Sequence, residues 1–244
     1  MIKLQELPNS IQTYSITAII DTALCIGAGG SSGSLADKPI VRNAEGNLLI
    51  PASQLKGRLR HECEKIARGL QWDICYSPNP QSMCPQRAGL DGNFDREEYK
   101  ISKEDKNHHC LICQIFGNPV LRSRVIFDDL ICEEEPENLP EIIRPGVTIN
   151  RRRRTGEESK LYFLETSPAN IKLRFQGNIC LSNSPFNNPD YVGALILAGL
   201  RHINALGGSK SAGLGWLNWE FPALSVEQAA WGFLAKGVGN NEKD

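Results

Sequence analysis

Between Asn170 and Ser182 the residues alternate between apolar and polar, and this alternation limits the possible folds more than any other feature. The apolar positions are Ile171, Leu173, Phe175, Ile179 and Leu181, and the polar positions are Lys172, Arg174, Gln176 and Asn178. A period of two predicts a half-buried antiparallel strand, with one face on a core and the other in water. The segment from Tyr191 to Asn204 is almost entirely apolar and predicts a well-buried helix. We therefore expect a sheet that is covered by at least one helix.

The remaining elements extend this unit. Residues Ser10 to Asp21, rich in Ile, Thr and Tyr, predict a first strand, and further strands are expected at Arg122 to Leu130 and Trp216 to Phe221. Ser53 is a suitable N-cap for a helix. The expected buried stripe of that helix is Leu55, Leu59, Cys63 and Ile66. The chain order predicts an α+β fold with a ferredoxin-like (RRM-like) core, in a single domain over residues 1–244.

A long, projecting β-hairpin is predicted over residues 144–165. Its arms are Val147-Thr148-Ile149 and Leu161-Tyr162-Phe163-Leu164. The turn between them carries four consecutive arginines: Arg151, Arg152, Arg153 and Arg154. Such a run is either a solvated surface or a tip that binds phosphates. We favour the tip, because the flanking arms are apolar and β-branched.

The stretch from Ile26 to Arg60 combines features that suit a phosphodiester. A glycine- and serine-rich loop, Gly27 to Ser34, leads to a lone carboxylate, Asp37. The predicted helix then opens with Ser53, Lys56, Arg58 and Arg60. Gly57, a poor helix former, indicates either local packing or the close approach of a backbone or ligand. The net charge is -1, so any binding of nucleic acid must depend on local patches such as this one.

A second glycine-rich loop runs from Gly207 to Gly215. Its first residues are Gly207, Gly208, Ser209 and Lys210. Glycine loops can expose backbone N–H groups to phosphates, although most are simple turns. The Walker order of residues is missing, so a nucleotide hydrolase is not expected.

Residues 71–118 are predicted to be an insertion, because prolines and glycines interrupt any regular period. Cys110-x-x-Cys113 would supply one side of a tetrahedral structural zinc site, and Cys75 and Cys84 the other. The metal would provide folding energy where no core exists. His109 or, less well, His108 could replace a cysteine, and the competing interpretation is four ordinary buried thiols. The remaining cysteines are expected in the core: Cys25, Cys63, Cys132 and Cys180.

Two negative features bear on location. No apolar run approaches eighteen residues, and no apolar segment follows a basic start. We therefore expect a soluble, cytoplasmic protein with no membrane partner. Eight cysteines in that compartment favour reduced thiols or a metal site over disulfides.

Four stretches together resemble the RAMP superfamily of CRISPR-associated proteins, and more narrowly the backbone subunit of type III effector complexes. They are LADKPIVRN around Asp37, IPASQLKGRLR at residues 50–60, RPGVTINRRRRTGEESKLYFLE at 144–165 and LILAGLRHINALGGSKSAGLGW at 195–216. The resemblance implies that Asp37 lies on the loop that cuts target RNA and that the hairpin is a thumb wedged into the guide–target duplex. It also implies that Lys56, Arg58, Arg60 and the Gly207–Gly215 loop hold the guide backbone. The four-arginine turn is more basic than the family pattern.

The partners implied by the resemblance are guide CRISPR RNA, target RNA, other RAMP backbone subunits, a large Cas10-type subunit and small subunits. Cleavage can use the 2′-hydroxyl of the RNA as nucleophile, so a single carboxylate that binds a magnesium-like ion or takes a proton is sufficient. Asp37 would have this role in an endoribonuclease, unless it only accepts backbone N–H bonds in a turn. The same motifs are compatible with a non-catalytic backbone subunit, a guide-processing endoribonuclease of the same superfamily, or a zinc-dependent enzyme that uses His108 or His109.

Overall fold

The computed structural model describes residues 11–27, 36–86, 99–100, 108–169, 171–182, 191–221 and 226–236. The strands in these ranges are β1 (Ile11–Ile20), β2 (Leu49–Ile50), β3 (Val125–Phe127), β4 (Leu130–Cys132), β5 (Ile142–Asn150), β6 (Thr155–Thr166), β7 (Leu173–Ser182) and β8 (Leu217–Glu220). The helices are α1 (Ala52–Gly69), α2 (Leu111–Phe116), α3 (Tyr191–His202) and α4 (Gln228–Ala235), with short 3-10 turns at Pro136–Asn138 and Lys210–Ala212. The predicted α+β class is confirmed.

The main sheet is antiparallel and has β7 at its centre. Within the described residues it contains six strands in the order β2-β4-β7-β1-β8, and β3 also pairs with β7. β1 runs along the whole of β7, from Ile11 opposite Ser182 to Ile20 opposite Leu173. The alternating segment therefore lies in the middle of the sheet.

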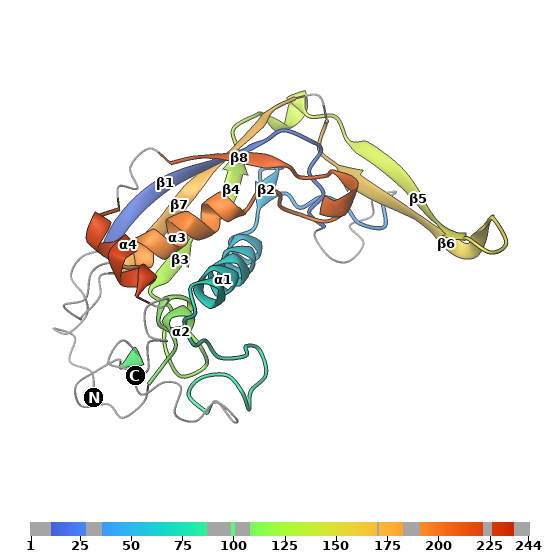
Figure 1. Cartoon of the computed structure of the whole chain (residues 1–244). Coiled ribbons are helices and arrows are strands. Elements are labelled where there is room, and N and C mark those ends of the chain that lie inside the picture. Colours follow the sequence, from blue (N-terminus) through green and yellow to red (C-terminus); the bar gives the residue numbers. More distant parts are fainter. Residues whose placement is uncertain are drawn as a thin grey trace.

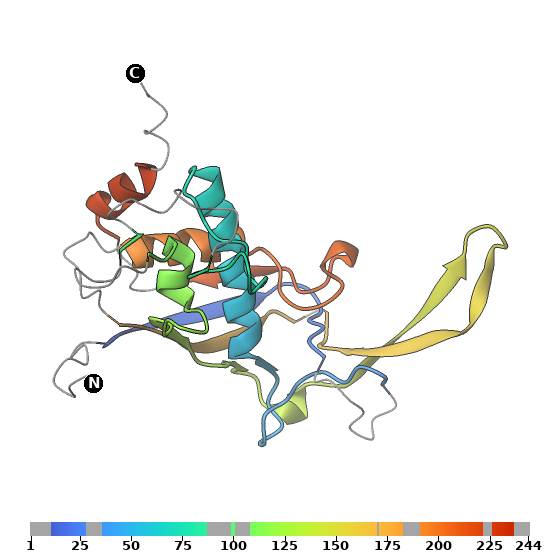
Figure 2. The ribbon, with the colours of Figure 1, turned by 90° about the horizontal axis from the view of Figure 1, so that it is seen from below.

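The helices α1 and α3 cover one face of this sheet, as Figures 1 and 2 show from two directions. They pack closely because Gly199 of α3 lies against α1: a Cβ atom there would come within 2.7 Å of Cys63 Sγ and of Leu59 Cδ1. The inward residues of β7 are buried, as predicted, except that Ile171 precedes the strand and is 43% exposed. None of the helices in the described ranges is both long and apolar enough to cross a bilayer.

Two local predictions were wrong for a shared reason. The single strand expected at residues 122–130 is divided into β3 and β4 by Asp128 and Asp129. Asp129 Oδ1 accepts a hydrogen bond of 2.6 Å from the backbone N–H of Ala52 at the start of α1. The helix begins at Ala52, with Pro51 as N-cap and no side-chain cap bond, so Ser53 is in the first turn and is not the cap. A carboxylate distant in sequence takes over the capping role.

Candidate functional site

The four predicted metal ligands lie together. Cys75, Cys84, Cys110 and Cys113 are all buried, and their sulfur atoms lie within 4.8 Å of one another. Cys75 Sγ is 3.6 Å from both Cys110 Sγ and Cys113 Sγ. Hydrogen bonds from Cys110 and then Cys113 lower the pKa of the Cys75 and Cys84 thiols and favour their thiolate forms, whereas the pKa values of Cys110 and Cys113 are raised by neighbouring sulfur atoms and by burial.

This arrangement fits a tetrahedral zinc ion. Sulfur atoms placed about 2.3 Å from a central ion are separated by about 3.8 Å in a tetrahedron. The two 3.6 Å separations match this within about 0.2 Å, and all four sulfur atoms lie within 4.8 Å of one another, so the thiolates can accept an ion after a modest adjustment. The cluster can bind a metal such as zinc.

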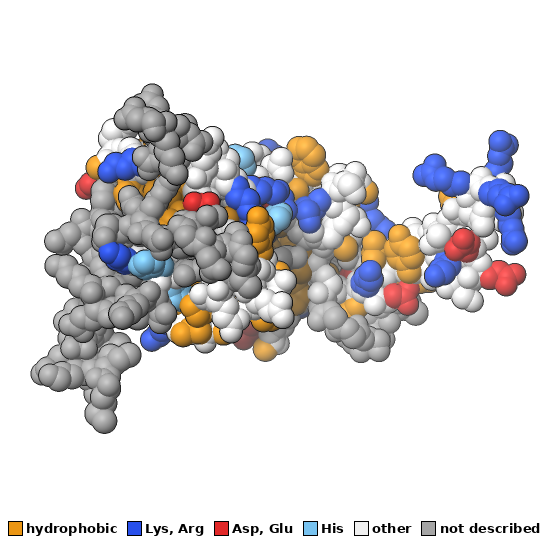
Figure 3. Space-filling view, turned by 60° about the horizontal axis from the view of Figure 1, so that its bottom comes forward, with side chains coloured by type: hydrophobic (Ala, Val, Ile, Leu, Met, Phe, Trp, Pro, Cys, Tyr) orange, Lys and Arg blue, Asp and Glu red, His pale blue; other side chains and the backbone are white. Residues whose placement is uncertain are grey.

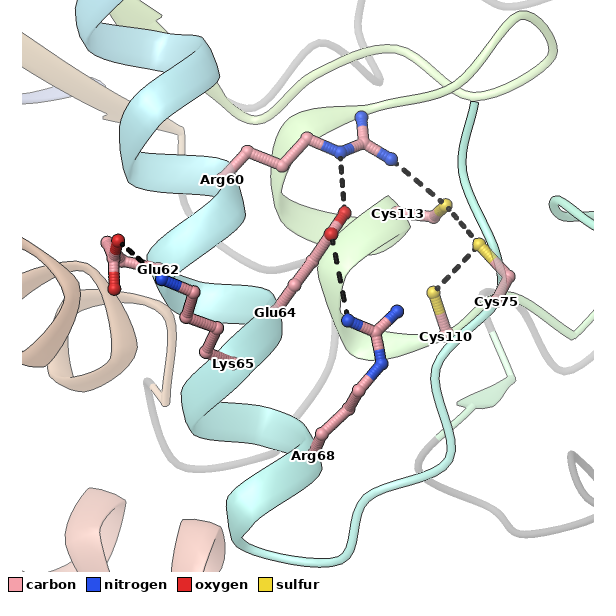
Figure 4. Close-up of polar contacts among 8 residues, drawn as sticks. All are labelled: Arg60, Glu62, Glu64, Lys65, Arg68, Cys75, Cys110 and Cys113. Carbon is pink, nitrogen blue, oxygen red and sulfur yellow. Dashed lines mark hydrogen bonds and ion pairs between the residues drawn. The ribbon is translucent and has the colours of Figure 1, made fainter. Parts of the chain in front are cut away.

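Neighbouring elements hold the cluster in place. Cys110 and Cys113 flank the start of α2, and the backbone N–H of Cys110 donates to Cys84 Sγ over 3.4 Å. Arg60 reaches over from α1, pairs with Glu64 at 3.2 Å and directs an N–H group at Cys113 Sγ, 3.9 Å away (Figure 4). His109 is buried, and its Nδ1 lies 2.8 Å from Asn118 Nδ2. Among the described residues the metal-binding group consists of cysteines alone.

The predicted hairpin is formed by β5 and β6 and projects far from the body (Figures 1 and 2). The residues Arg151 to Arg154 form its exposed turn. Asn150 shapes this turn, since its Oδ1 accepts the backbone N–H groups of Arg152 and Arg153, each at 3.1 Å. Figure 3 shows basic side chains at the tip of the hairpin with acidic side chains beside them, and further basic side chains over the body. Four guanidinium groups at the end of an extended ribbon form a local cationic patch on a chain with almost no net charge.

The base of the hairpin is fixed to the segment that carries Asp37. Lys38 donates its N–H to Phe163 O (3.3 Å) and accepts the N–H of Glu165 (3.1 Å), so this segment pairs with β6. The buried carboxylate of Glu165 accepts the N–H of Ile40 (3.0 Å) and pairs with Arg42 (3.1 Å). The hairpin therefore forms one unit with the Asp37 segment.

Asp37 itself is exposed, and its Oδ2 accepts the backbone N–H of Phe163 over 2.7 Å. Asp37 thus accepts a backbone N–H bond, as the competing interpretation expects, but the bond comes from strand β6 and not from within a turn. The glycine- and serine-rich loop that precedes Asp37 lies outside the described residues, apart from Gly27.

The second glycine loop packs against Cys25. Gly207 has a φ of +89°, and a Cβ atom there would lie 2.5 Å from Cys25 O. The backbone N–H of Gly208 donates to that same carbonyl over 2.7 Å. Lys210 Nζ donates to Gly207 O at 3.0 Å. Close backbone approach and a positive φ explain Gly207, whereas a Cβ atom on Gly208 would be accommodated at 3.5 Å from Cys25 O; the N–H of Gly208 is already engaged.

One pocket, which we call the hairpin-base pocket, brings several of these segments together. It has a volume of about 540 Å³. Its lining residues are Cys25, Ile26, Gly27, Lys38, Gln54, Tyr162, Leu164, Gly208 and Ser209. Burial raises the pKa of the Cys25 thiol, against the opposing charges of Lys38 and Arg144. Segments distant in sequence thus form one recess beside Asp37 with cations around it.

The residues of α1 that are predicted to contact RNA separate into two groups. Ser53 and Lys56 line a smaller pocket of about 300 Å³ together with Arg122, and burial lowers the pKa of Lys56. Arg58 pairs with Glu62 at 3.0 Å, and Arg60 faces the cysteine cluster. Their contact with RNA remains a prediction.

Sequence reasoning does not assign Lys38, Gln54 or Tyr162 to a site, although all three line the hairpin-base pocket. Lys38 adjoins Asp37, and Gln54 lies between Ser53 and Lys56, so both could have been predicted from their position next to candidate site residues. The pattern around Tyr162 indicates only a strand arm, because its place at the pocket depends on the pairing of β5 with β6.

A family model described as the RAMP superfamily matches residues 17–218, which is most of the chain. Among proteins with curated descriptions, none matches the sequence.

Proposed function

The chain belongs to the RAMP superfamily, and from this premise we propose that it is a guide-RNA-binding backbone subunit of a type III CRISPR interference complex. Membership in the superfamily indicates a CRISPR-associated, RNA-binding role, and the superfamily includes RNA endonucleases. In the proposed assembly the partners are guide and target RNA, further backbone subunits, a large subunit and small subunits. The strand order β4-β7-β1-β8 and its antiparallel senses support a ferredoxin-like core.

The observation that carries the proposal is the hairpin-base pocket. The Asp37 segment, the first turn of α1, the second glycine loop and the hairpin meet there. An RNA strand that followed this recess would meet Lys38 beside Asp37 and the arginine turn at the far end of the ribbon. Contacts of this kind read phosphates and not base sequence, as a protein that accepts any guide requires.

In the proposed cleavage the 2′-hydroxyl of the target attacks the adjacent phosphate and the P–O5′ bond breaks, which leaves a 2′,3′-cyclic phosphate; the 2′-hydroxyl proton passes to the Asp37 carboxylate or to water, and water protonates the leaving 5′-oxygen. Asp37 Oδ2 is held by Phe163, so the exposed carboxylate has a defined direction, and Oδ1 would be the oxygen that meets the RNA. A magnesium-like ion held by Asp37 and by RNA oxygens would stabilise the charge that develops on the phosphate.

The test compares assembled complexes that contain wild-type chain, Asp37→Asn or Asp37→Ala, with a complementary labelled RNA as substrate. Asp37→Asn keeps an oxygen that can accept the Phe163 N–H but removes the charge. We expect both variants to bind guide and target normally and to lose cleavage. Persistent cleavage by Asp37→Asn would contradict a catalytic carboxylate.

A non-catalytic backbone role is the second candidate, and the hydrogen bond from Phe163 to Asp37 favours it. In that case Asp37→Ala would lower the thermal stability of the hairpin base, while any cleavage by the complex would be unchanged. A guide-processing enzyme would instead cut free precursor RNA as an isolated chain.

A further inference from the structure

We propose that the hairpin-base pocket holds one nucleotide of bound RNA, whose base stacks on the ring of Tyr162. The inference rests on the proposed function and adds a specific contact that positions the strand. It follows from the way in which the ring is held and from the groups that surround it.

The Tyr162 ring packs over a glycine on the paired strand. Gly146 lies directly opposite Tyr162 in the ribbon. A Cβ atom on Gly146 would overlap Tyr162 Cζ and lie 2.6 Å from the hydroxyl oxygen, so the outer edge of the ring covers the glycine. The side chain is nonetheless 41% exposed and lines the pocket. One side of the ring is therefore supported by backbone, and an open side is presented to a ligand.

The groups around the ring match a nucleotide. Lys38 offers a cation for a phosphate, and Ser209 offers a hydroxyl. Gln54 also lines the pocket, and its Oε1 is buried without a hydrogen-bond partner. Leaving such an acceptor unpaired is costly. An amino group on a base edge or a ribose hydroxyl can supply the missing donor, after a small rotation of the Gln54 side chain.

The size and position of the pocket favour a base over a bare phosphate. A volume of about 540 Å³ is within the range of small-molecule sites, about 300–1,000 Å³. Aromatic side chains are effective platforms for bases in single-stranded RNA, because every base has a π-face. Tyr162 adjoins Phe163, whose N–H holds Asp37. A base stacked on Tyr162 would thus bring the backbone of the same nucleotide close to Asp37.

The opposite face of the ribbon provides a matched control. Leu161 is the neighbour of Tyr162 in β6 and is 59% exposed. Successive strand residues point to opposite faces, so Leu161 faces away from the pocket. Leu161→Ala therefore removes exposed apolar surface from the hairpin without altering the proposed platform.

The experiment measures the affinity of the full chain for a single-stranded RNA of mixed sequence that carries one 2-aminopurine, as a function of salt. We expect Tyr162→Leu and Tyr162→Ala to bind about 10-fold more weakly, and Tyr162→Phe to stay within about 2-fold of wild type. Gly146→Ala should weaken binding like Tyr162→Leu, because the new methyl group displaces a ring that is still present. The salt slope should be unchanged in all these variants, since no phosphate contact is lost.

The fluorescence of 2-aminopurine gives a second readout, because stacking on the ring should quench it in wild type and Tyr162→Phe only. Equal weakening by Leu161→Ala and Tyr162→Leu, or wild-type affinity in Tyr162→Leu, would overturn the stacking platform and leave the proposed function standing. Failure of the wild-type chain to bind RNA, alone and in the assembled complex, would overturn both.

Discussion

Removal of metal from the cysteine cluster should destabilise the chain strongly. Cys75 Sγ already lies 3.6 Å from Cys110 Sγ and from Cys113 Sγ, close to the separation in a zinc site, so the folded state can accept an ion after a modest adjustment. A ligand that binds only the folded state adds about 4 kcal/mol to the free energy of unfolding when its free concentration is 1,000 times Kd. For a chain of this length each kcal/mol corresponds to about 2–4 °C in Tm. Chelation should therefore lower Tm by about 8–16 °C.

The loss should be concentrated near the cluster. The helix α2, Leu111–Phe116, has six residues, too few to persist without tertiary support; the cluster supplies part of that support, and burial of its side chains in the core supplies the rest. Trp72, by contrast, stacks on Phe233 and donates to Leu234 O at 2.8 Å, and these contacts do not involve the sulfur atoms. Hydrogen exchange after chelation should therefore rise most in residues 73–86 and 108–118, and less at Trp72.

The assay is thermal unfolding of reduced, purified chain with and without a strong chelator, together with the metal content by mass spectrometry. Cys84→Ser should lower Tm by a similar amount and should make the chain insensitive to chelator. Cys180→Ser is the matched control, because Cys180 lies on β7 outside the cluster, where its sulfur atom contacts the Thr13 hydroxyl. A zinc content below half an equivalent, or an unchanged Tm on chelation, would refute the metal site.

Of three further predictions, two concern glycines, and the third concerns an ion pair. Gly57→Ala should raise the stability of α1 by about 1 kcal/mol, since a Cβ atom there meets nothing within 4 Å. Gly215→Ala should lower the stability of the chain by more than about 2 kcal/mol, because the φ of Gly215 is +71° and a Cβ atom there would clash with Leu206 O. Denaturant unfolding distinguishes these outcomes. The hydrogen bond from Arg174 lowers the pKa of Glu220 below 4.5, so the stability difference between wild type and Arg174→Ala should be fully present above pH 4.5 and vanish as pH falls through that lowered pKa. A difference that grows on acidification would contradict this pairing.

The parts of the fold that can be predicted well from the sequence are those in which the spacing of apolar residues directly indicates which residues are buried. The alternation in β7 identifies its buried residues because a strand in the centre of a one-sided sheet leaves no other arrangement. The division between β3 and β4 cannot be predicted in this way. It depends on Asp129 reaching Ala52, a contact across 77 positions that no local period records.

For the site, the spacing of residues in the sequence predicts the metal ligands better than it predicts which side chains contact one another. A C-x-x-C motif and an irregular segment are enough to predict Cys75, Cys84, Cys110 and Cys113 as ligands, and the structure brings these four together. The sequence pattern groups Arg60 with Lys56, because the two lie four residues apart on a helix. The position of a Cα atom does not determine where a long side chain ends. The Arg60 side chain points away from Lys56, because it pairs with Glu64 and with the sulfur atom of Cys113.

The same strand sets the positions of the two groups to which we assign chemistry. Lys38 is hydrogen-bonded to β6 on both sides of Leu164, and Asp37 is bonded to Phe163. The carboxylate therefore keeps a fixed register with the Tyr162 ring, whatever the path of the loop before it. A nucleotide that stacks on the ring would be presented to Asp37 at a constant offset along the backbone. Sequence-independent phosphate contacts allow an RNA to slide, whereas this offset would select one phosphate for each subunit.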